Sequence, residues 1–304
     1  MLAVSGSPFD SEEYLYELKW DGIRALAAVG REGTTLFSRN GNNISRRYPE
    51  LEFLGCLNSL PAVLDGEVVV LQDGLPSFHK LQTRNHLQDE RKIRAAAREM
   101  PAVFIVFDLL SLRGEDLTLL PLVKRKELLQ ELVQEGSHLA LSRHVLGSGK
   151  ALFELARQRG LEGVMAKRLD SSYQAGKRSN YWIKFRNTKS MSCVICGYVK
   201  GSGERGTLGS LILGAYRGDV LSYVGNVGSG LGSAEIEMLL QRFRRIGRDT
   251  SPFASPPPLK GAVWVEPELV CEVSYLERGQ VLRHPVFHGL RSDVSPRECS
   301  IEQG

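Results

Sequence analysis

The sequence lacks any long apolar run: no stretch approaches the roughly 18 apolar residues of a membrane-spanning helix. Its first residues, Met1-Leu2-Ala3-Val4-Ser5-Gly6, have no basic segment followed by an apolar one, so no signal peptide is predicted. Cysteine is scarce, and the five cysteines are an odd number without a framework spacing, which favours reduced thiols over disulfides. We therefore expect a cytoplasmic protein with no membrane partner.

What is present is typical of an ordinary globular protein. The hydrophobic and charged fractions are 42% and 24%, which argues against disordered and fibrous classes. With 304 residues the chain is long for one core and comfortable for two. A net charge of +4 permits a nucleic-acid partner without requiring one, because the local clustering of Lys and Arg matters more than their sum.

The first part of the chain alternates strands with helices. Residues 63–71 predict a hairpin or a bend at Asp65-Gly66, and 79–100 predict a helix that ends at Pro101. The apolar run 102–107 predicts a buried strand with Asp108 at its end. Further strands are expected at 15–18, 25–29 and 34–38, and further helices at 123–134 and 150–159.

Strands dominate beyond about residue 189. They are expected at 193–199, 208–216, 220–225 and 263–275, with a single helix at 233–246 whose N-cap is Ser233. Short strands with one helix indicate a small barrel such as the OB-fold, which is a nucleic-acid-binding architecture. The sequence thus predicts an α+β protein with two domains, residues 1–188 and residues 189–304.

Lys19 is the first candidate for chemistry, in the run Glu17-Leu18-Lys19-Trp20-Asp21-Gly22-Ile23-Arg24. A lysine attacks phosphorus only as the free amine, so it needs neighbours that favour that form and a substrate held in line. Asp21 and Gly22 permit a tight turn, and Arg24, which follows the turn, would place a cation beside the phosphates. Taken alone, Lys-x-Asp-Gly is also a common surface turn, so the motif needs support from elsewhere in the chain.

That support comes from the order of the segments that follow. They are Ser38-Arg39-Asn40-Gly41, Asp65-Gly66-Glu67, Phe107-Asp108-Leu109, Glu162-Gly163-Val164-Met165-Ala166-Lys167, Trp182-Ile183-Lys184-Phe185-Arg186 and Arg291-Ser292-Asp293. The series resembles the motif set of the covalent nucleotidyl transferases, and among them the ATP-dependent DNA ligases. Residues 208–214, 223–230 and 282–291 resemble the ligase module of the bacterial ligase D proteins of non-homologous end joining. The resemblance covers nearly the whole chain.

The resemblance implies an adenylation (nucleotidyltransferase) domain with ATP-grasp-like antiparallel sheets and helices, followed by an OB-fold. It implies that Lys19 forms a phosphoamide with AMP and that the Glu17 segment reads the adenine amino group. Phe107 would stack on the purine, although its strand position also suits a core residue. Asp21, Glu67 and Glu162 would hold the ribose hydroxyl and a divalent metal, Mg²⁺ or Mn²⁺. Gly66 and Gly163 would allow close approach of the backbone to the ligand.

The resemblance also implies a cationic lining around the triphosphate and later the nick phosphate, because phosphoryl transfer depends on positioning and charge neutralisation. The residues concerned are Arg24, Arg39, Lys167, Lys184 and Arg186. Each alone would more often be a solvated surface charge. Arg291 and Asp293 belong to the last motif, which orients the leaving pyrophosphate. Here Val294 follows Asp293 where many family members carry Lys, and this puts the efficiency of the first step in question.

Two other patterns carry less weight. Cys193-x-x-Cys196 is half a zinc site without a second pair, so we interpret both as strand residues. The loop 201–206 lacks the helix and the Gly-Lys-Ser/Thr ending of a phosphate loop, so we interpret it as a hairpin loop that touches DNA through Lys200 and Arg205.

The sequence as a whole predicts an ATP-dependent DNA ligase that seals nicked or broken double-stranded DNA, with its active site between two domains. Because Lys19 lies near the start, we expect no DNA-binding domain before it, so that the chain is a compact ligase or a module of a larger protein. We expect a monomer that works beside an end-binding protein and a repair polymerase. Alternatives are an RNA ligase, an mRNA capping guanylyltransferase, or a non-catalytic module that binds nicks or ends.

Overall fold

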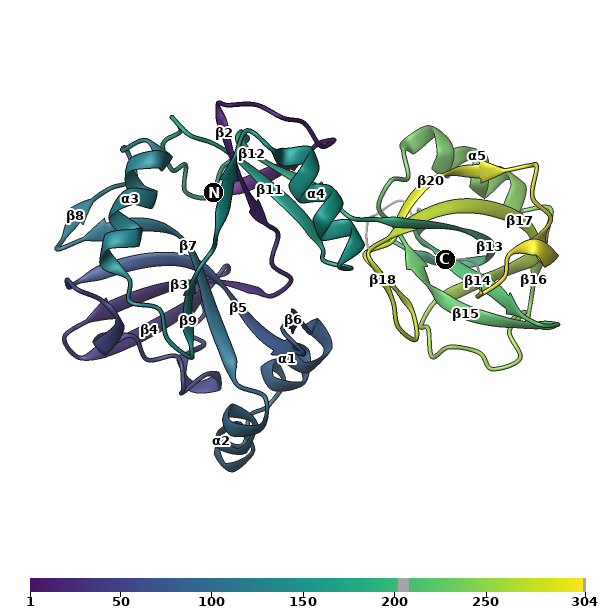
Figure 1. The fold of residues 1–304 in the computed structure, drawn as a ribbon. Helices are drawn as coiled ribbons and strands as arrows, with labels where there is room; N and C mark the ends of the chain where they lie inside the picture. The colour runs from purple at the N-terminus through teal and green to yellow at the C-terminus, as the bar shows by residue number, and fades with distance from the viewer. Residues whose placement is uncertain (202–207, 303–304) are drawn as a thin grey trace. The chain divides into compact units, whose positions relative to one another are not determined.

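The computed structural model describes residues 1–201 and 208–302. The chain divides into two compact units, Met1–Asn187 and Thr188–Gly304, which can be followed by colour in Figure 1. Within the described ranges, no helix is long and apolar enough to cross a membrane. Each unit is described separately below.

The first unit contains two sheets. One has the strand order β1-β12-β11-β2-β10, formed by β1 (Leu2–Ser5), β12 (Arg178–Arg186), β11 (Gly163–Arg168), β2 (Tyr14–Leu18) and β10 (His144–Leu146). The other has the order β4-β3-β5-β7-β8, with β6 beside β5 and β9 beside β7. Its strands are β4 (Gly33–Ser38), β3 (Ile23–Gly30), β5 (Ala62–Gln72), β7 (Ala102–Leu112), β8 (Glu115–Asp116), β6 (Leu75–Pro76) and β9 (Leu139–Leu141).

Helices flank these sheets. They are α1 (Phe78–Asn85), α2 (Glu90–Glu99), α3 (Leu122–Leu132) and α4 (Gly149–Gln158), with short 3₁₀ turns at Ser45–Arg47 and Leu54–Cys56. The main core of the unit lies on one face of the larger sheet, where β3 alternates buried Ala25, Ala27 and Val29 with less buried neighbours. This two-residue period fixes which face of β3 is apolar and hence its register.

The second unit is built around a six-stranded sheet with the order β15-β14-β13-β17-β16 and β20 beside β17. Its strands are β13 (Lys189–Lys200), β14 (Leu208–Arg217), β15 (Val220–Val227), β16 (Gly247–Arg248), β17 (Ala262–Tyr275) and β20 (Val286–Arg291). A small pair, β18 (Glu277–Arg278) and β19 (Leu282–Arg283), helix α5 (Ser233–Phe243) and a turn at Pro296–Glu298 complete it. Figure 1 shows these elements in green and yellow.

Three expected elements differ from the structure in the first unit. Asp65-Gly66 is a register irregularity inside the continuous strand β5, because the buried Asp65 side chain binds Arg24 and Tyr173 instead of capping a turn. The helix expected at 79–100 is two helices, since the Asp89 side chain accepts from the Lys92 amide and begins α2. Strand β7 continues past Asp108 to Leu112.

In the second unit the four predicted strands are present near their expected bounds, whereas β16, β18, β19 and β20 were not predicted and helix α5 differs at both ends. Gly232, not Ser233, is the N-cap, and the helix ends at Phe243 instead of residue 246. Cys193 and Cys196 lie in β13 as buried free thiols, which confirms their interpretation as strand residues. The expected hairpin loop 201–206, with Arg205, falls almost entirely outside the described residues.

Candidate active site

Lys19 lies in the loop that links the two sheets of the first unit, between β2 and β3. The Lys19 amide donates to the Gly163 carbonyl oxygen at 2.9 Å, which ties the loop to the start of β11. Gly22 lets the loop pass close to β5, because a Cβ there would lie 2.3 Å from the Val68 carbonyl oxygen. Where the sequence predicts a tight turn at Asp21-Gly22, the structure has a bend at Gly22, and the glycine is required there by packing.

The Lys19 ammonium is held by Glu162. Lys19 Nζ donates to Glu162 Oε2 at 2.6 Å, and the side chains are 20% and 8% exposed. Gly163, next to Glu162, has a φ of +144°, and a Cβ there would meet the Phe185 carbonyl oxygen at 1.9 Å. Gly66 is likewise pressed against protein, with a Cβ position 2.5 Å from the Phe104 ring. Both glycines therefore permit close packing of strands, and the close approach of backbone to a ligand that the sequence suggests for them stays a prediction.

Glu17 carries the most enclosed charge of the site. Its side chain is buried, and its two oxygens accept from Lys126 Nζ at 2.5 Å and from Lys167 Nζ at 2.7 Å. Burial opposes ionisation, yet the two ammonium groups outweigh it and lower the pKa of Glu17 below its ordinary value. Burial lowers the pKa of Lys167, partly against the pull of Glu17. Glu17 is therefore an ionised, acceptor-only group.

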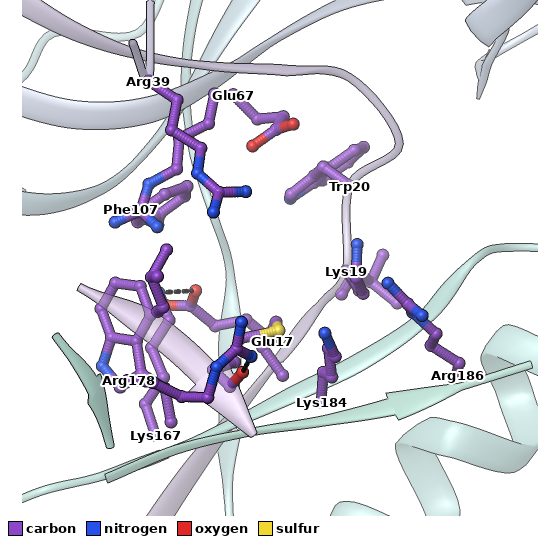
Figure 2. A pocket seen from close by; sticks show the side chains of 16 residues that line it. Glu17, Lys19, Trp20, Arg39, Glu67, Phe107, Lys167, Arg178, Lys184 and Arg186 are labelled. Carbon is purple, nitrogen blue, oxygen red and sulfur yellow. Dashed lines mark hydrogen bonds and ion pairs between the residues drawn. The ribbon is translucent and has the colours of Figure 1, made fainter. Parts of the chain in front are cut away.

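A pocket of about 220 Å³ opens beside these groups (Figure 2). Nine of the residues predicted from the sequence line it: Glu17, Lys19, Arg24, Arg39, Glu67, Phe107, Lys167, Lys184 and Arg186. The other lining residues are Leu2, Ala3, Leu18, Trp20, Met165, Arg178 and Trp182. Segments separated by up to 184 positions in sequence therefore share one cavity within the first unit.

One end of the pocket is cationic. Figure 2 shows Lys19, Lys184 and Arg186 near one another, the last two from β12. Burial and the neighbouring cations Arg186 and Lys19 lower the pKa of Lys184. In the ranges 1–201 and 208–302 no carboxylate forms an ion pair with Arg39, Lys184 or Arg186. Lys184 and Arg186 are partly buried and Arg39 is exposed, and cations without a counter-charge are suited to binding an anion.

Glu67 faces the same pocket from β5. Part of its side chain reaches the pocket surface, but burial raises the pKa of Glu67 from 4.5 to about 8, opposed by Lys19 and Arg24 and reinforced by Glu162 and Asp65. Among the described residues, none forms a hydrogen bond with its carboxyl group. Glu67 thus offers free acceptor atoms to a bound ligand.

Phe107 and Lys167 lie together at the end of the pocket near Glu17. Lys167 Nζ is 4.1 Å from the centre of the Phe107 ring and 4.5 Å from that of Trp182, which are cation–π distances. Its one hydrogen bond in the described structure goes to Glu17. Lys167 therefore lies among the aromatic rings, which it shares with Arg24, 5.6 Å from the Phe107 ring and 5.2 Å from the Trp182 ring.

Arg24 lines the pocket with its donors already engaged. Its guanidinium forms a bidentate pair with Asp65 at 3.0 and 2.7 Å and donates to the Met1 carbonyl oxygen at 2.5 Å. A further bond reaches the Tyr173 hydroxyl at 3.2 Å. The arrangement fits a structural cation that shapes the pocket wall.

Three predicted residues are not among those that line this pocket. Glu162 reaches it through Lys19, and Asp21 lies in the loop beside it. Arg291 belongs to the second unit, where it forms a bidentate pair with Asp293 at 2.8 and 2.6 Å and a bond to Glu272 at 2.6 Å. No group of three or more His, Cys, Asp or Glu among the described residues fits a metal ion.

The sequence reasoning missed Lys126, Arg178 and Trp182 as parts of this site. Lys126 lies on α3 in a run of helix-forming residues, where a lysine is normally a solvated charge. Arg178 and Trp182 share β12 with Lys184, and the two-residue period of a strand, counted back from Lys184, could have found Trp182. Helical spacing was the available signal, because Lys126 lies four residues after Leu122 and three before Leu129 on the buried face of α3, whereas Lys124 does not.

Comparisons with known proteins decide the family. The model of the ATP dependent DNA ligase domain matches residues 2–186, and that of the ATP dependent DNA ligase C terminal region matches residues 204–294. This chain belongs to the ATP-dependent DNA ligases. The ligase is 37% identical to the multifunctional non-homologous end joining protein LigD of Pseudomonas aeruginosa, over 96% of this chain and 35% of that protein. It is 35% identical to LigD of Mycolicibacterium smegmatis, over 99% of this chain and 39% of that protein. The ligase chain thus spans little more than a third of these relatives.

Solved structures agree with this assignment. The ligase domain of Mycobacterium tuberculosis LigD matches with a TM-score of 0.54 at 33% identity, covering 99% of this chain and 97% of that one. A mycobacterial DNA ligase D complexed with ATP and MES matches with a TM-score of 0.56 at 32% identity, covering 98% and 96%. The expected α+β architecture of an adenylation domain followed by an OB-fold is confirmed.

Proposed function

We propose that this chain is an ATP-dependent DNA ligase module in which Lys19 becomes covalently bound to AMP and then passes it to the 5′-phosphate of a nick. The observation that carries the proposal is Lys19 Nζ, held at 2.6 Å from Glu162 at the cationic end of a pocket whose other end contains Phe107 and an ionised Glu17. We also propose a domain boundary near residue 188, where the two units divide.

The two ends of the pocket take different parts of the nucleotide in this proposal. Adenine lies at the end with Glu17, Phe107 and Lys167, where an acceptor-only carboxylate suits the 6-amino group and Lys167 can donate to a ring nitrogen. The phosphates lie between Lys19, Lys184 and Arg186, which have the charge to receive them. Glu67, without a hydrogen-bond partner in the described structure, would accept from a ribose hydroxyl.

A divalent metal fits this site through its carboxylates. Magnesium binds to one or two carboxylates together with phosphate oxygens and water. Glu67 has free acceptor atoms, and Glu162 has one oxygen beyond its bond with Lys19, so these two residues would hold it. When bound, Mg²⁺ or Mn²⁺ neutralises charge on the phosphates during transfer. Asp21 stays a predicted third ligand.

The reaction then follows from the positions of the protein groups. Lys19 Nζ, after losing its proton, attacks the α-phosphorus, and the bond to the bridging oxygen breaks so that pyrophosphate leaves. Glu162 is positioned to take the proton, since it already accepts a hydrogen bond from Nζ. The 5′-phosphate of the nick next displaces Lys19 from AMP. The 3′-hydroxyl finally attacks the phosphorus of the nick's 5′-phosphate, which joins the strands and releases AMP.

The partner of this module is duplex DNA with a nick or a break. Contacts to backbone phosphates would dominate, so the affinity should not depend on sequence and should fall with salt. The LigD relatives carry end joining in their names. We therefore propose that this module works in end joining, beside an end-binding protein and a repair polymerase supplied by the same or another chain.

The decisive test is covalent labelling with [α-³²P]ATP. Wild type should acquire a label that Lys19→Ala abolishes, whereas Lys150→Ala, at an exposed lysine of α4, should label normally. The labelled protein should then seal a nicked duplex without further ATP. Labelling by GTP but not ATP would indicate a capping guanylyltransferase. Equal failure of wild type and Lys19→Ala to seal the nick would leave a non-catalytic binding module.

A further inference from the structure

Lys126 is a buried cation that no motif of the family resemblance includes. Its side chain is 6% exposed although it belongs to α3, on which Lys124 is 61% exposed. Holding an ammonium group in a protein interior is unfavourable unless its donors are satisfied. A buried lysine therefore requires a specific set of acceptors.

The ammonium of Lys126 has three such acceptors. Nζ donates to Glu17 Oε1 at 2.5 Å, to the Phe107 carbonyl oxygen at 3.3 Å and to the Ser142 carbonyl oxygen at 3.3 Å. A lysine ammonium has three N–H donors, so its hydrogen-bonding capacity is filled. The three acceptors come from β2, from β7 and from the segment directly after β9. Lys126 thus joins the two sheets of the first unit at a single point.

That point lies directly behind the adenine end of the pocket. Glu17 and Phe107 line the pocket and Lys126 does not, so Lys126 fixes the two residues from behind without touching the ligand. Ser142 extends the connection, because its hydroxyl accepts from Trp20 Nε1 at 3.3 Å, next to Lys19. Because Lys167 Nζ donates to the other oxygen, Glu17 Oε2, both oxygens of the carboxylate are held by an ammonium group.

We propose that Lys126 is a positioning residue for base recognition, which holds the Glu17 carboxylate and the Phe107 backbone where they select adenine. The proposal rests on the function proposed above for the pocket. Without the ammonium, Glu17 Oε1 loses its partner and the carboxylate can rotate on Lys167 alone. Recognition of the base should suffer, while the chemistry at Lys19 should not.

The test separates nucleotide binding from the later steps of ligation. Lys126→Met retains the apolar stem without the charge, and Lys124→Met is the matched control on the same helix. Lys126→Met should raise the KM for ATP in Lys19 adenylation by about ten- to a hundredfold, the usual effect of removing a group that orients a ligand-binding residue. Its preference for ATP over GTP and ITP should fall by a similar factor, while Lys124→Met should match wild type.

A second substrate distinguishes positioning from general damage. A nick that already carries 5′-AMP needs no free ATP, and its adenine is tethered to the bound duplex, so Lys126→Met should lower the sealing rate of this nick much less than it lowers Lys19 adenylation. Lys126→Arg, which keeps the charge, should recover part of the ATP affinity. If Lys126→Met folds and its KM and ATP/GTP ratio are unchanged, or if sealing of the adenylated nick falls as much as adenylation, the proposal is wrong. Failure of wild type to label with ATP would instead overturn the proposed function.

Should Lys126→Met be too unstable to assay, Glu17→Gln provides the second measurement. Lys126→Arg in the wild-type and Glu17→Gln backgrounds forms a double-mutant cycle for ATP affinity. If Lys126 acts through Glu17, the arginine substitution should alter the KM at least threefold more in wild type than in Glu17→Gln. Equal effects in both backgrounds would refute the proposal.

Discussion

Glu67 should make the stability of the first unit fall as pH rises toward 8. Burial raises the pKa of this carboxyl group from 4.5 to about 8. Between these two values the folded protein holds a proton that the unfolded chain has lost, so the stabilisation is complete at low pH and is lost as pH rises through the folded pKa. The interval between the two pKa values, at about 1.4 kcal/mol per pH unit, sets an upper limit of about 5 kcal/mol on the free energy of unfolding that is lost over this pH range.

The substitution Glu67→Gln tests this directly, because glutamine resembles the protonated carboxyl group and does not titrate. From pH 5 to pH 8, the free energy of unfolding of wild type should fall relative to that of Glu67→Gln. In its steepest part, the difference in the free energy of unfolding between the two proteins should change by about 1.4 kcal/mol per pH unit. Glu131→Gln, at an exposed glutamate of α3, should leave the wild-type pH dependence intact.

Urea unfolding followed by tryptophan fluorescence is a suitable assay. The protein has three tryptophans, and in a Trp264→Phe background the remaining Trp20 and Trp182 both report on the first unit. The measurements should be made without nucleotide or divalent metal, which would compete with the proton for Glu67. Parallel pH profiles for Glu67→Gln and its parent would refute the argument that burial keeps this carboxyl group protonated.

Three further substitutions test the framework and the phosphate end of the pocket. Asp108→Asn leaves the fully buried Arg125 without its carboxylate partner and should cost about 3–5 kcal/mol of stability in the same urea assay. Gly163→Ala places a Cβ 1.9 Å from a carbonyl oxygen of β12 at a φ of +144°, so it should abolish Lys19 labelling and lower the urea midpoint. Lys184→Met should slow labelling with ATP about a hundredfold or more without changing that midpoint, since it removes a cation aimed at the phosphates.

The order of motifs in the sequence was sufficient to predict the family and most of the pocket. Nine predicted residues line one cavity because each motif lies at the end or in the middle of a strand, and the strands of two sheets converge on the Lys19 loop. Strand β3 was readable because its burial alternates, and β7 was readable because its apolar run is almost continuously buried. The motifs did not predict which oppositely charged side chain each charged residue pairs with.

The errors arose where tertiary contacts override local signals. Asp65-Gly66 has the composition of a turn, but Arg24 neutralises the aspartate inside a sheet. Asp108 was expected at a strand end, yet it is buried and clamped by Arg125 from α3. Both cases are aspartates whose cation lies far along the chain, 41 and 17 residues away, and periodicity within a short window cannot detect such a pair.

The distribution of charge explains why similar cations in this pocket should have different roles. Arg24 and Lys167 are each bonded to a carboxylate, Asp65 and Glu17 respectively, so their charge is largely compensated before any ligand binds. Lys184 and Arg186 have no such partner within the described ranges. In the proposed binding mode, a triphosphate would therefore be attracted more by this second pair than by the first, which gives shape to the cavity. Lys19 is intermediate between the two pairs, because Glu162 compensates its charge at 2.6 Å in this structure, and the proposed reaction requires that ion pair to break.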